Sequence, residues 1–168
     1  MPRSSSENVG GTVPGTGSVR AVNDRMAERL LHEPPQPLVE GNYALRVLET
    51  RGRVSGRSRR TPVGVLLSGG QEWLVSPVRD RDWVRNLCAE PRCVLSAGGE
   101  RQHRFAILDE GDRAAIAVTR YLSVVQAPWA LQAFPVGPGT LREEVLEQLA
   151  TMAVFRLGAG DEHSGDRA

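Results

Sequence analysis

Lysine is absent from this sequence of 168 residues, so all 21 basic side chains are arginines. Acidic residues number 20, which leaves a formal net charge of +1. A charge this small excludes a global electrostatic attraction to nucleic acid, so any anion-binding site must come from a local cluster. The arginine bias is typical of a GC-rich genome, but a guanidinium fork still suits phosphate and carboxylate groups.

Cysteine is scarce and long apolar runs are missing. The two cysteines, Cys88 and Cys93, have no histidine near them, which excludes a zinc pattern and indicates reduced thiols. No apolar run approaches the ~18 residues of a membrane-spanning helix. Residues 1–20 also lack the apolar core of a secretory signal. We therefore expect a cytoplasmic protein that holds no metal.

Both ends of the chain are rich in serine or glycine, and we expect disordered tails over residues 1–19 and 159–168. The residues between them, 20–158, suit one domain with a single core and a helix at its start. No internal repeat is present.

Apolar periodicity predicts a helix over 20–32, with Val22, Met26, Leu30 and Leu31 on one face. A later helix over 110–125 is expected to point Ile116, Val118, Tyr121 and Leu122 inward. Strands are predicted at 43–50, 60–68, 72–76, 92–97, 101–108 and 152–157, and further helices at 80–90, 127–134 and 140–150.

This order of elements favours a small barrel. Six short strands have few helices between them, and the first three read as an antiparallel meander. A doubly wound dinucleotide-binding sheet would need regular strand–helix alternation and a G-x-G-x-x-G motif, and the sequence has neither.

The turn between the first two strands reads "TRGRVSGRSRRTPV", residues 50–63, and contains five arginines and no acid. Gly52 and Gly56 allow a sharp turn with exposed amides, and Ser55 adds a hydroxyl. Backbone amides and arginine forks together favour phosphate or carboxylate. The alternative is a solvated loop with coincidental arginines. Nucleic-acid binding is disfavoured because no aromatic residue is interleaved with the charges.

A second motif, "SPVRDRDWVRNL" at 76–87, runs from a strand end into a helix. Asp80 or Asp82 at the helix start indicates an N-cap. Backbone amides in such a place also suit a planar polar ring or an anion. Trp83 is interpreted as a core residue in preference to a stacking platform.

No catalytic triad is visible. The sequence has no G-x-S-x-G, and its three histidines, His32, His103 and His163, lie in unremarkable places. We expect His103 to lie exposed in a strand. Any chemistry is therefore expected to come from a bound cofactor.

The two motifs stand in the order and spacing of a known family. The turn reads "ETRGRVSGRSRRTPV", the second motif reads "LVSPVRDRDWVRNLCAEP", and "MAVFRL" follows near the end. Together they resemble the deazaflavin-dependent nitroreductase family of actinobacteria, which uses coenzyme F420. The resemblance runs from about Leu45 to Leu157. The turn matches the family pattern at Thr50, Gly52, Arg53, Ser55, Gly56, Arg59 and Pro62.

The resemblance implies a mainly β fold with flanking helices, a six-stranded antiparallel split β-barrel. It implies hydride transfer between reduced coenzyme F420 and an electron-poor small molecule (an enone, quinone or nitro compound), and it is compatible with a place in specialised metabolism. The cofactor-binding residues that it implies are Arg53, Ser55, Gly56, Arg57, Arg59, Pro62, Ser76, Pro77, Val78, Asp82, Trp83 and Asn86.

The family pattern also implies roles for these residues. Arg53, Ser55, Arg57 and Arg59 would contact the phosphate and polyglutamate tail. The segment 76–78 would lie along the deazaflavin ring, with Asp82, Trp83 and Asn86 supporting that wall. No catalytic residue is implied, and Tyr121 is a candidate substrate contact.

Two departures keep alternatives open. Val54 stands where relatives often carry Lys or Arg, and a short charged loop replaces a Gly-Gly stretch. The alternatives are a split barrel that binds FMN or haem, a cofactor-free biosynthetic cyclase or isomerase, and a plain anion- or nucleic-acid-binding module. The expected partner is a small molecule, and the expected state is a monomer or homodimer. The acids Asp24, Glu28 and Glu33 argue against a membrane-binding first helix.

Overall fold

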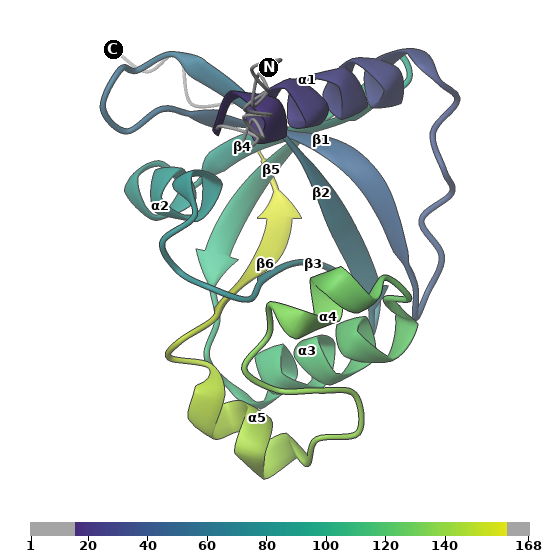
Figure 1. The fold of residues 1–168 in the computed structure, drawn as a ribbon, viewed down its shortest axis with the longest axis vertical. Coiled ribbons are helices and arrows are strands. Elements are labelled where there is room, and N and C mark those ends of the chain that lie inside the picture. The colour runs from purple at the N-terminus through teal and green to yellow at the C-terminus, as the bar shows by residue number, and fades with distance from the viewer. Residues whose placement is uncertain (1–15, 161–168) are drawn as a thin grey trace, which may run out of the picture.

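The structure, a computed structural model, describes residues 16–160 and shows six antiparallel strands closed into a barrel (Figure 1). The fold class expected from the sequence is therefore confirmed. The strands are β1 (Tyr43–Arg51), β2 (Ser58–Ser68), β3 (Gln71–Ser76), β4 (Arg92–Ala97), β5 (Glu100–Leu108) and β6 (Ala153–Ala159).

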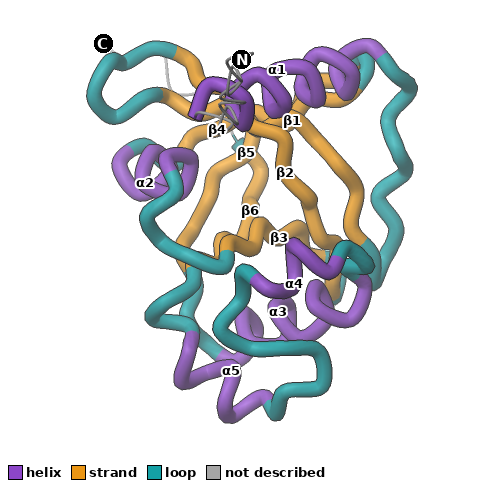
Figure 2. Tube along the Cα trace, in the orientation of Figure 1, coloured by secondary structure: helices purple, strands orange, loops and turns teal. Residues whose placement is uncertain are grey.

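Helices surround this barrel without interrupting it (Figure 2). They are α1 (Thr16–His32), α2 (Asp82–Ala89), α3 (Asp112–Val124), α4 (Pro128–Gln132) and α5 (Arg142–Gln148). α1 begins at Thr16, inside the segment predicted as the N-terminal tail, and β6 ends at Ala159, the first residue of the predicted C-terminal tail. Residues 1–15 and 161–168 of the predicted tails lie outside the described residues. No helix in the described range is long and apolar enough to cross a membrane.

The strand order around the barrel is β1-β2-β3-β6-β5-β4. β1 and β2 form a long hairpin, and β2 continues into β3 through Gly69 and Gly70, both at positive φ. The predicted meander is thus confirmed. Pairing of β3 with β6, and of β1 with β4, closes the ring.

The chain builds two separate cores. One fills the barrel, with Leu48, Leu74 and Phe155 among its strand residues and Trp83 and Leu87 contributed by α2. The other lies outside the barrel, where the outward faces of β2, β3 and β6 are covered by α3 and the segment that follows it. Because strand side chains alternate between faces, β3 can serve both cores at once.

Two predicted inward faces differ from the structure. In α3, Val118 and Leu122 are buried, but Ile116 is 49% exposed and alanines pack against the sheet instead. Small side chains let the helix approach closely, which turns Ile116 outward. In α1, Ala27 is buried whereas Val22 is 56% exposed, because only the later part of the helix packs on the barrel.

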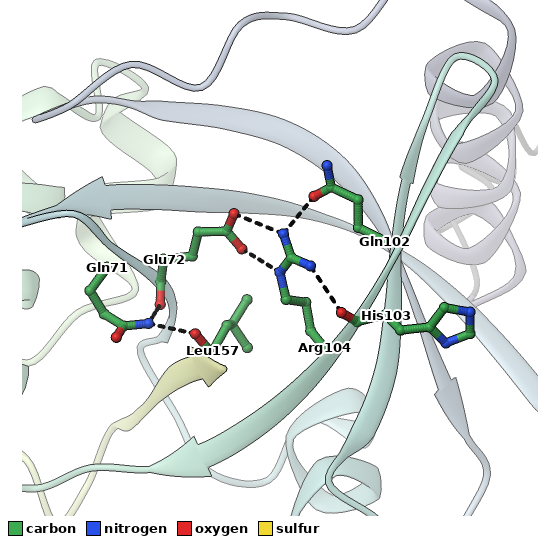
Figure 3. Close-up of polar contacts among 6 residues, drawn as sticks. All are labelled: Gln71, Glu72, Gln102, His103, Arg104 and Leu157. Carbon is green, nitrogen blue, oxygen red and sulfur yellow. Dashed lines mark hydrogen bonds and ion pairs between the residues drawn. The ribbon is translucent and has the colours of Figure 1, made fainter. Parts of the chain in front are cut away.

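A charged cluster lies at one end of the barrel interior (Figure 3). Arg104 and Glu72 each precede a barrel-core residue by two positions, so both side chains point to the inner side of their strands. The guanidinium donates to both carboxylate oxygens, at 2.9 and 3.2 Å, and to Gln102 Oε1 at 2.7 Å. The hydrogen bond that Arg104 donates to Glu72 raises the pKa of Arg104.

Both cysteines are free thiols, as expected. Cys93 pairs in register with Arg104, and burial raises the pKa of its thiol to about 12. The thiol is therefore neutral and acts as a small core residue. Within residues 16–160 no group of three or more His, Cys, Asp or Glu side chains is placed to hold a metal ion.

The Arg104–Glu72 pair gives a test of the fold. The two side chains are only 21% and 20% exposed, so Glu72→Ala leaves a partly desolvated guanidinium without its partner. We expect the free energy of unfolding, measured by urea denaturation, to fall by about 1–3 kcal/mol. Glu33→Ala removes an exposed pair with Arg29 and is the control, with an expected change under about 0.5 kcal/mol. Equal effects would contradict a special role for the interior pair.

Candidate functional site

A large cleft, of about 1530 Å³, opens on the side of the barrel. Strands β1, β2 and β3 form its floor, and the β1–β2 turn and α2 border one end. α1 lies above this floor and α3 and α4 lie below it in the view of Figure 1. Every functional residue expected from the sequence is on or next to these elements.

The arginine-rich turn is held by its glycines. The Gly52 amide donates to Arg57 O and the Gly56 amide to Gly52 O, each at 2.8 Å. Gly56 has φ of +69°, a conformation that other residues rarely adopt. A Cβ at Gly52 would lie 2.8 Å from Ser55 Oγ and 3.1 Å from Arg57 O. Both glycines are therefore required by this geometry.

Most backbone amides of the turn are already hydrogen-bonded, so fewer are free than the sequence led us to expect. Besides Gly52 and Gly56, the Arg57 amide is bonded to Ser55 Oγ and the Arg53 amide to Asn86 Oδ1. Only the amides of Val54 and Ser55 have no hydrogen-bond partner among the described residues, and both residues line the cleft. These two adjacent donors are the part of the turn backbone that can bind an anion.

Asn86 fastens the turn to α2. Its side chain is 3% exposed and accepts hydrogen bonds from the Arg53 amide (3.1 Å) and Arg53 Nη1 (3.0 Å). Its amide nitrogen donates to Thr50 Oγ1 at 3.2 Å. A buried amide with all three contacts fixes the relative position of two segments that are distant in sequence. The sequence assigned Asn86 to the wall of the site but did not indicate this contact.

The arginines of the turn divide into two groups. Arg53 is engaged inside the protein, because Nη2 also pairs with Asp82 Oδ1 at 3.1 Å. Arg59 lines the cleft, and its guanidinium makes no hydrogen bond or ion pair within residues 16–160. Arg57, predicted as a tail contact, does not line the cleft. Three further arginines line it that were not among the cofactor-binding residues implied by the resemblance: Arg20 of α1, Arg60 of β2 and Arg81 before α2.

The start of α2 differs from expectation. Arg81 occupies the N-cap position without a side-chain cap, and Asp82 is the first helical residue. The predicted N-cap role of Asp80 or Asp82 is therefore wrong, since the carboxylate of Asp82 bonds to Arg53 instead. Trp83 is 7% exposed and packs against Phe155, so the core interpretation is confirmed, and the same residue also lines the cleft.

Hydrogen bonds from Ser76 and Arg79 fix the segment after β3. Ser76 is fully buried and its hydroxyl donates to Val78 O at 2.6 Å, so it does not face the cleft, whereas Pro77 lines it together with Leu74 and Val75. Val78 is 38% exposed and lies outside the lining. Arg79, which the sequence did not single out, donates from Nε to Met152 O at 2.6 Å and pins this loop.

Aromatic rings line the other end of the cleft. Tyr121 of α3 lies between Tyr43 and Phe134, with ring centroids 5.8 and 5.9 Å away. Burial raises the pKa of the Tyr121 phenol, with the nearby Tyr43 hydroxyl adding to the shift. The phenol is therefore protonated at neutral pH and has no hydrogen-bond partner among the described residues. This leaves its O–H available as a donor to a ligand.

A protein-family comparison assigns the chain. The model of the F420H(2)-dependent quinone reductases matches residues 35–130, more than half of the sequence. The chain belongs to this family. The match confirms the resemblance stated from the sequence, because members of this oxidoreductase family use reduced coenzyme F420 as their electron donor. The comparison with curated proteins finds no match.

The solved structures that are similar to this member of the F420H(2)-dependent quinone reductase family share little sequence identity with it. A heme-binding protein from Mycobacterium smegmatis is 20% identical, with a TM-score of 0.46 over 67% of this chain. The chain spans only 45% of the length of that protein. An F420-H2 dependent reductase (FDR-A) is 18% identical, with a TM-score of 0.44 over 73% of this chain and 99% of its own.

The Gly52 geometry gives a prediction. Gly52→Ala places a methyl group against Ser55 Oγ and the Arg57 carbonyl, so the turn must shift and the free energy of unfolding should fall by about 1–3 kcal/mol. Gly99, in the β4–β5 turn, has no positive φ, and a Cβ added there would meet no atom within 4 Å. Gly99→Ala is therefore the matched control, expected within about 0.5 kcal/mol of the parent. Thermal or urea unfolding of both variants measures these changes. An unchanged free energy of unfolding in Gly52→Ala would contradict the tight turn.

Proposed function

We propose that the protein transfers hydride from reduced coenzyme F420 to an electron-poor small organic acceptor such as a quinone, an enone or a nitro compound. The observation that carries the proposal is the division of one cleft into a cationic end and an apolar middle. The anionic tail of the cofactor matches the first, and its flat ring matches the second.

The residues at the cationic end fit the tail. Val54 and Ser55, with their free amides, line the same cleft as Arg59, Arg60 and Arg81. Oriented amides and guanidinium groups are the donors that phosphate and carboxylate prefer. Arg53 contributes mainly by holding the turn, since its guanidinium is shared with Asp82 and Asn86. The tail contact inferred for Arg57 remains a prediction.

The residues in the middle of the cleft fit the ring. Leu74, Val75, Pro77 and Trp83 line the cleft, and all four are apolar and largely buried, so this part of the lining carries no charge. When bound, reduced coenzyme F420 supplies the hydride and its electron pair. The chain positions the acceptor, excludes water with its apolar lining and offers a hydrogen bond from Tyr121. That bond is directed to the oxygen of a carbonyl acceptor, where negative charge develops during reduction.

Titration of coenzyme F420, followed by its own fluorescence, tests the cationic end. Arg59→Ala removes an unpaired guanidinium from the cleft, so F420 should bind roughly 10- to 100-fold more weakly. Arg85→Ala removes the same charge from the exposed side of α2, outside the cleft lining, and should leave the Kd within about twofold. Absence of F420 binding by the parent protein would reject the proposed function.

Val54 allows the opposite test. Its side chain is 91% exposed and lines the cleft next to the free amides. Val54→Arg adds a cation near the expected tail and should tighten F420 binding by roughly 3- to 10-fold at low salt. The gain should disappear at high salt, as screening predicts. A gain that is independent of salt would contradict an electrostatic contact with the tail.

Tyr121→Phe tests the substrate side. Loss of one donor to the carbonyl oxygen should lower kcat/KM for a quinone roughly 5- to 30-fold, measured as oxidation of reduced F420. The Kd of F420 should not change, because the groups assigned to the tail are Arg59 and the amides of Val54 and Ser55, not the Tyr121 hydroxyl. Because the phenol pKa is raised, the parent should keep its activity as pH rises to the ordinary tyrosine value of 10.0. If the parent lost activity well below that pH while Tyr121→Phe did not, a protonated donor with a raised pKa would be contradicted.

A further inference from the structure

The loop between β3 and α2, residues 77–81, forms part of the cleft wall with little support from its own backbone. Pro77 and Arg81 line the cleft. β3 ends at Ser76, and among the described residues no backbone–backbone hydrogen bond joins residues 77–80 to another element. The position of this loop therefore depends on side chains.

Arg79 supplies the contact that reaches outside the loop. Its Nε donates to Met152 O at 2.6 Å and its Nη2 to Leu149 O at 3.0 Å. The hydroxyl of Ser76, by contrast, bonds within the same segment, to Val78 O. In the part of the chain that the structure describes, no other side chain of the loop makes a hydrogen bond or ion pair, so Arg79 is its only side-chain anchor to the rest of the protein.

The acceptors of Arg79 belong to a closely packed part of the protein. Leu149 caps the C-terminus of α5, and Met152 immediately precedes β6. Both are buried in the core outside the barrel, at 2% and 0% exposure. A guanidinium fork suits carbonyl oxygens at the end of a helix. Nη2 also pairs with Glu110, ahead of α3, so one side chain joins the cleft loop to the layer formed by α3 and α5.

This anchor is separate from the one at the cationic end of the cleft. There the β1–β2 turn is held by Asn86 through Arg53 and Thr50. Arg79 bonds only to residues that follow β5. Removal of Arg79 should therefore release the loop and its buried Pro77, while the turn keeps its position. The two ends of the cleft can be tested one at a time.

We infer that Arg79 is a positioning residue for hydride transfer, which sets where Pro77 stands in the cleft by holding the loop to the end of α5. This inference rests on the proposed function, in which Pro77 belongs to the surface that fits the cofactor ring. Arg79 itself does not line the cleft. Hydride transfer requires the donor and acceptor carbon atoms to be held close together, and a displacement of about 1 Å can lower a rate roughly 100-fold. A residue outside the cleft thereby controls the rate of the step without binding either ligand.

Single-turnover oxidation of reduced F420 at saturating cofactor measures this step in the full chain. Duroquinone is the acceptor, because its fully methylated ring blocks addition of the exposed Cys88 thiol. Arg79→Ala should lower the rate constant roughly 10- to 100-fold. The Kd of F420, measured by its fluorescence, should rise less than about fivefold, because Arg59 and the turn amides stay in place and only the exposed Arg81 can shift.

Matched variants separate positioning from loss of charge or stability. Arg79→Lys keeps a charge opposite Glu110 but lacks the fork for two carbonyls, so its rate should fall nearly as far as that of Arg79→Ala. Guanidinium chloride at millimolar concentration, far below what unfolds a protein, should restore part of the Arg79→Ala rate. Arg156→Ala removes a guanidinium of nearly equal exposure, 35% against 36%, that pairs with Asp109 instead, and should change the rate less than about twofold. Glu72→Ala, with its expected loss of stability, should also keep the parent rate.

Backbone amide NMR relaxation of the full chain without cofactor tests the loop independently of catalysis. In the parent, order parameters at Val78 and Asp80 should be about 0.85, the value of a rigid backbone, and in Arg79→Ala they should fall below about 0.6. Arg156→Ala should keep the parent values. If Arg79→Ala does not fold, Arg79→Lys replaces it in both measurements.

The outcomes distinguish this inference from the proposed function. A parent that does not bind F420 or does not reduce duroquinone rejects the proposed hydride transfer to quinones and, with it, the positioning role. A parent that does both, beside an Arg79 variant that keeps the parent rate, overturns the positioning role alone. Unchanged order parameters in that variant would overturn it too, since the loop would then be held without Arg79. Equal losses of rate in Arg79→Ala and Arg156→Ala would mean a general loss of structure and would likewise reject it.

Discussion

The cleft depends on the buried side chain of Asn86. One amide accepts two hydrogen bonds from Arg53 and donates a third to Thr50, so the β1–β2 turn and α2 cannot move independently. An aspartate could not donate to Thr50, and an alanine would leave buried polar groups unpaired. The position of the cationic end relative to the apolar middle is therefore set by a contact between residues that lie far apart in sequence.

This arrangement explains how an arginine-rich turn can be rigid and still keep unpaired donors on the cleft. Arg53 forms an ion pair with Asp82, while the Arg59 guanidinium and the amides of Val54 and Ser55 stay unpaired among the described residues. The barrel below has its own core, and α3 and α5 pack around a second one outside it. Because the cores are separate, α1 and α4 can shape the ligand space without disturbing the strands that form its floor.

The strands were predictable because their signals are local. Alternating apolar residues, glycine pairs and the proline after α2 gave all six strands, with bounds that differ from the structure by at most two residues. The wrong expectations concern tertiary partners. Ile116 is exposed because alanines make the close contact of α3, Val22 because the early part of α1 borders a cleft, and Asp82 is no N-cap because Arg53 competes for its carboxylate.

The sequence by itself determined the six strands, the family with the cofactor that it uses, and the two segments that border the cleft, since each is encoded by residues close together in the chain. Only the tertiary structure decided which arginines stay unpaired, that Asn86 joins the two segments, and that α1 and α4 both line the cleft. These are contacts between distant residues, and a motif lists side chains without saying which of them already have partners.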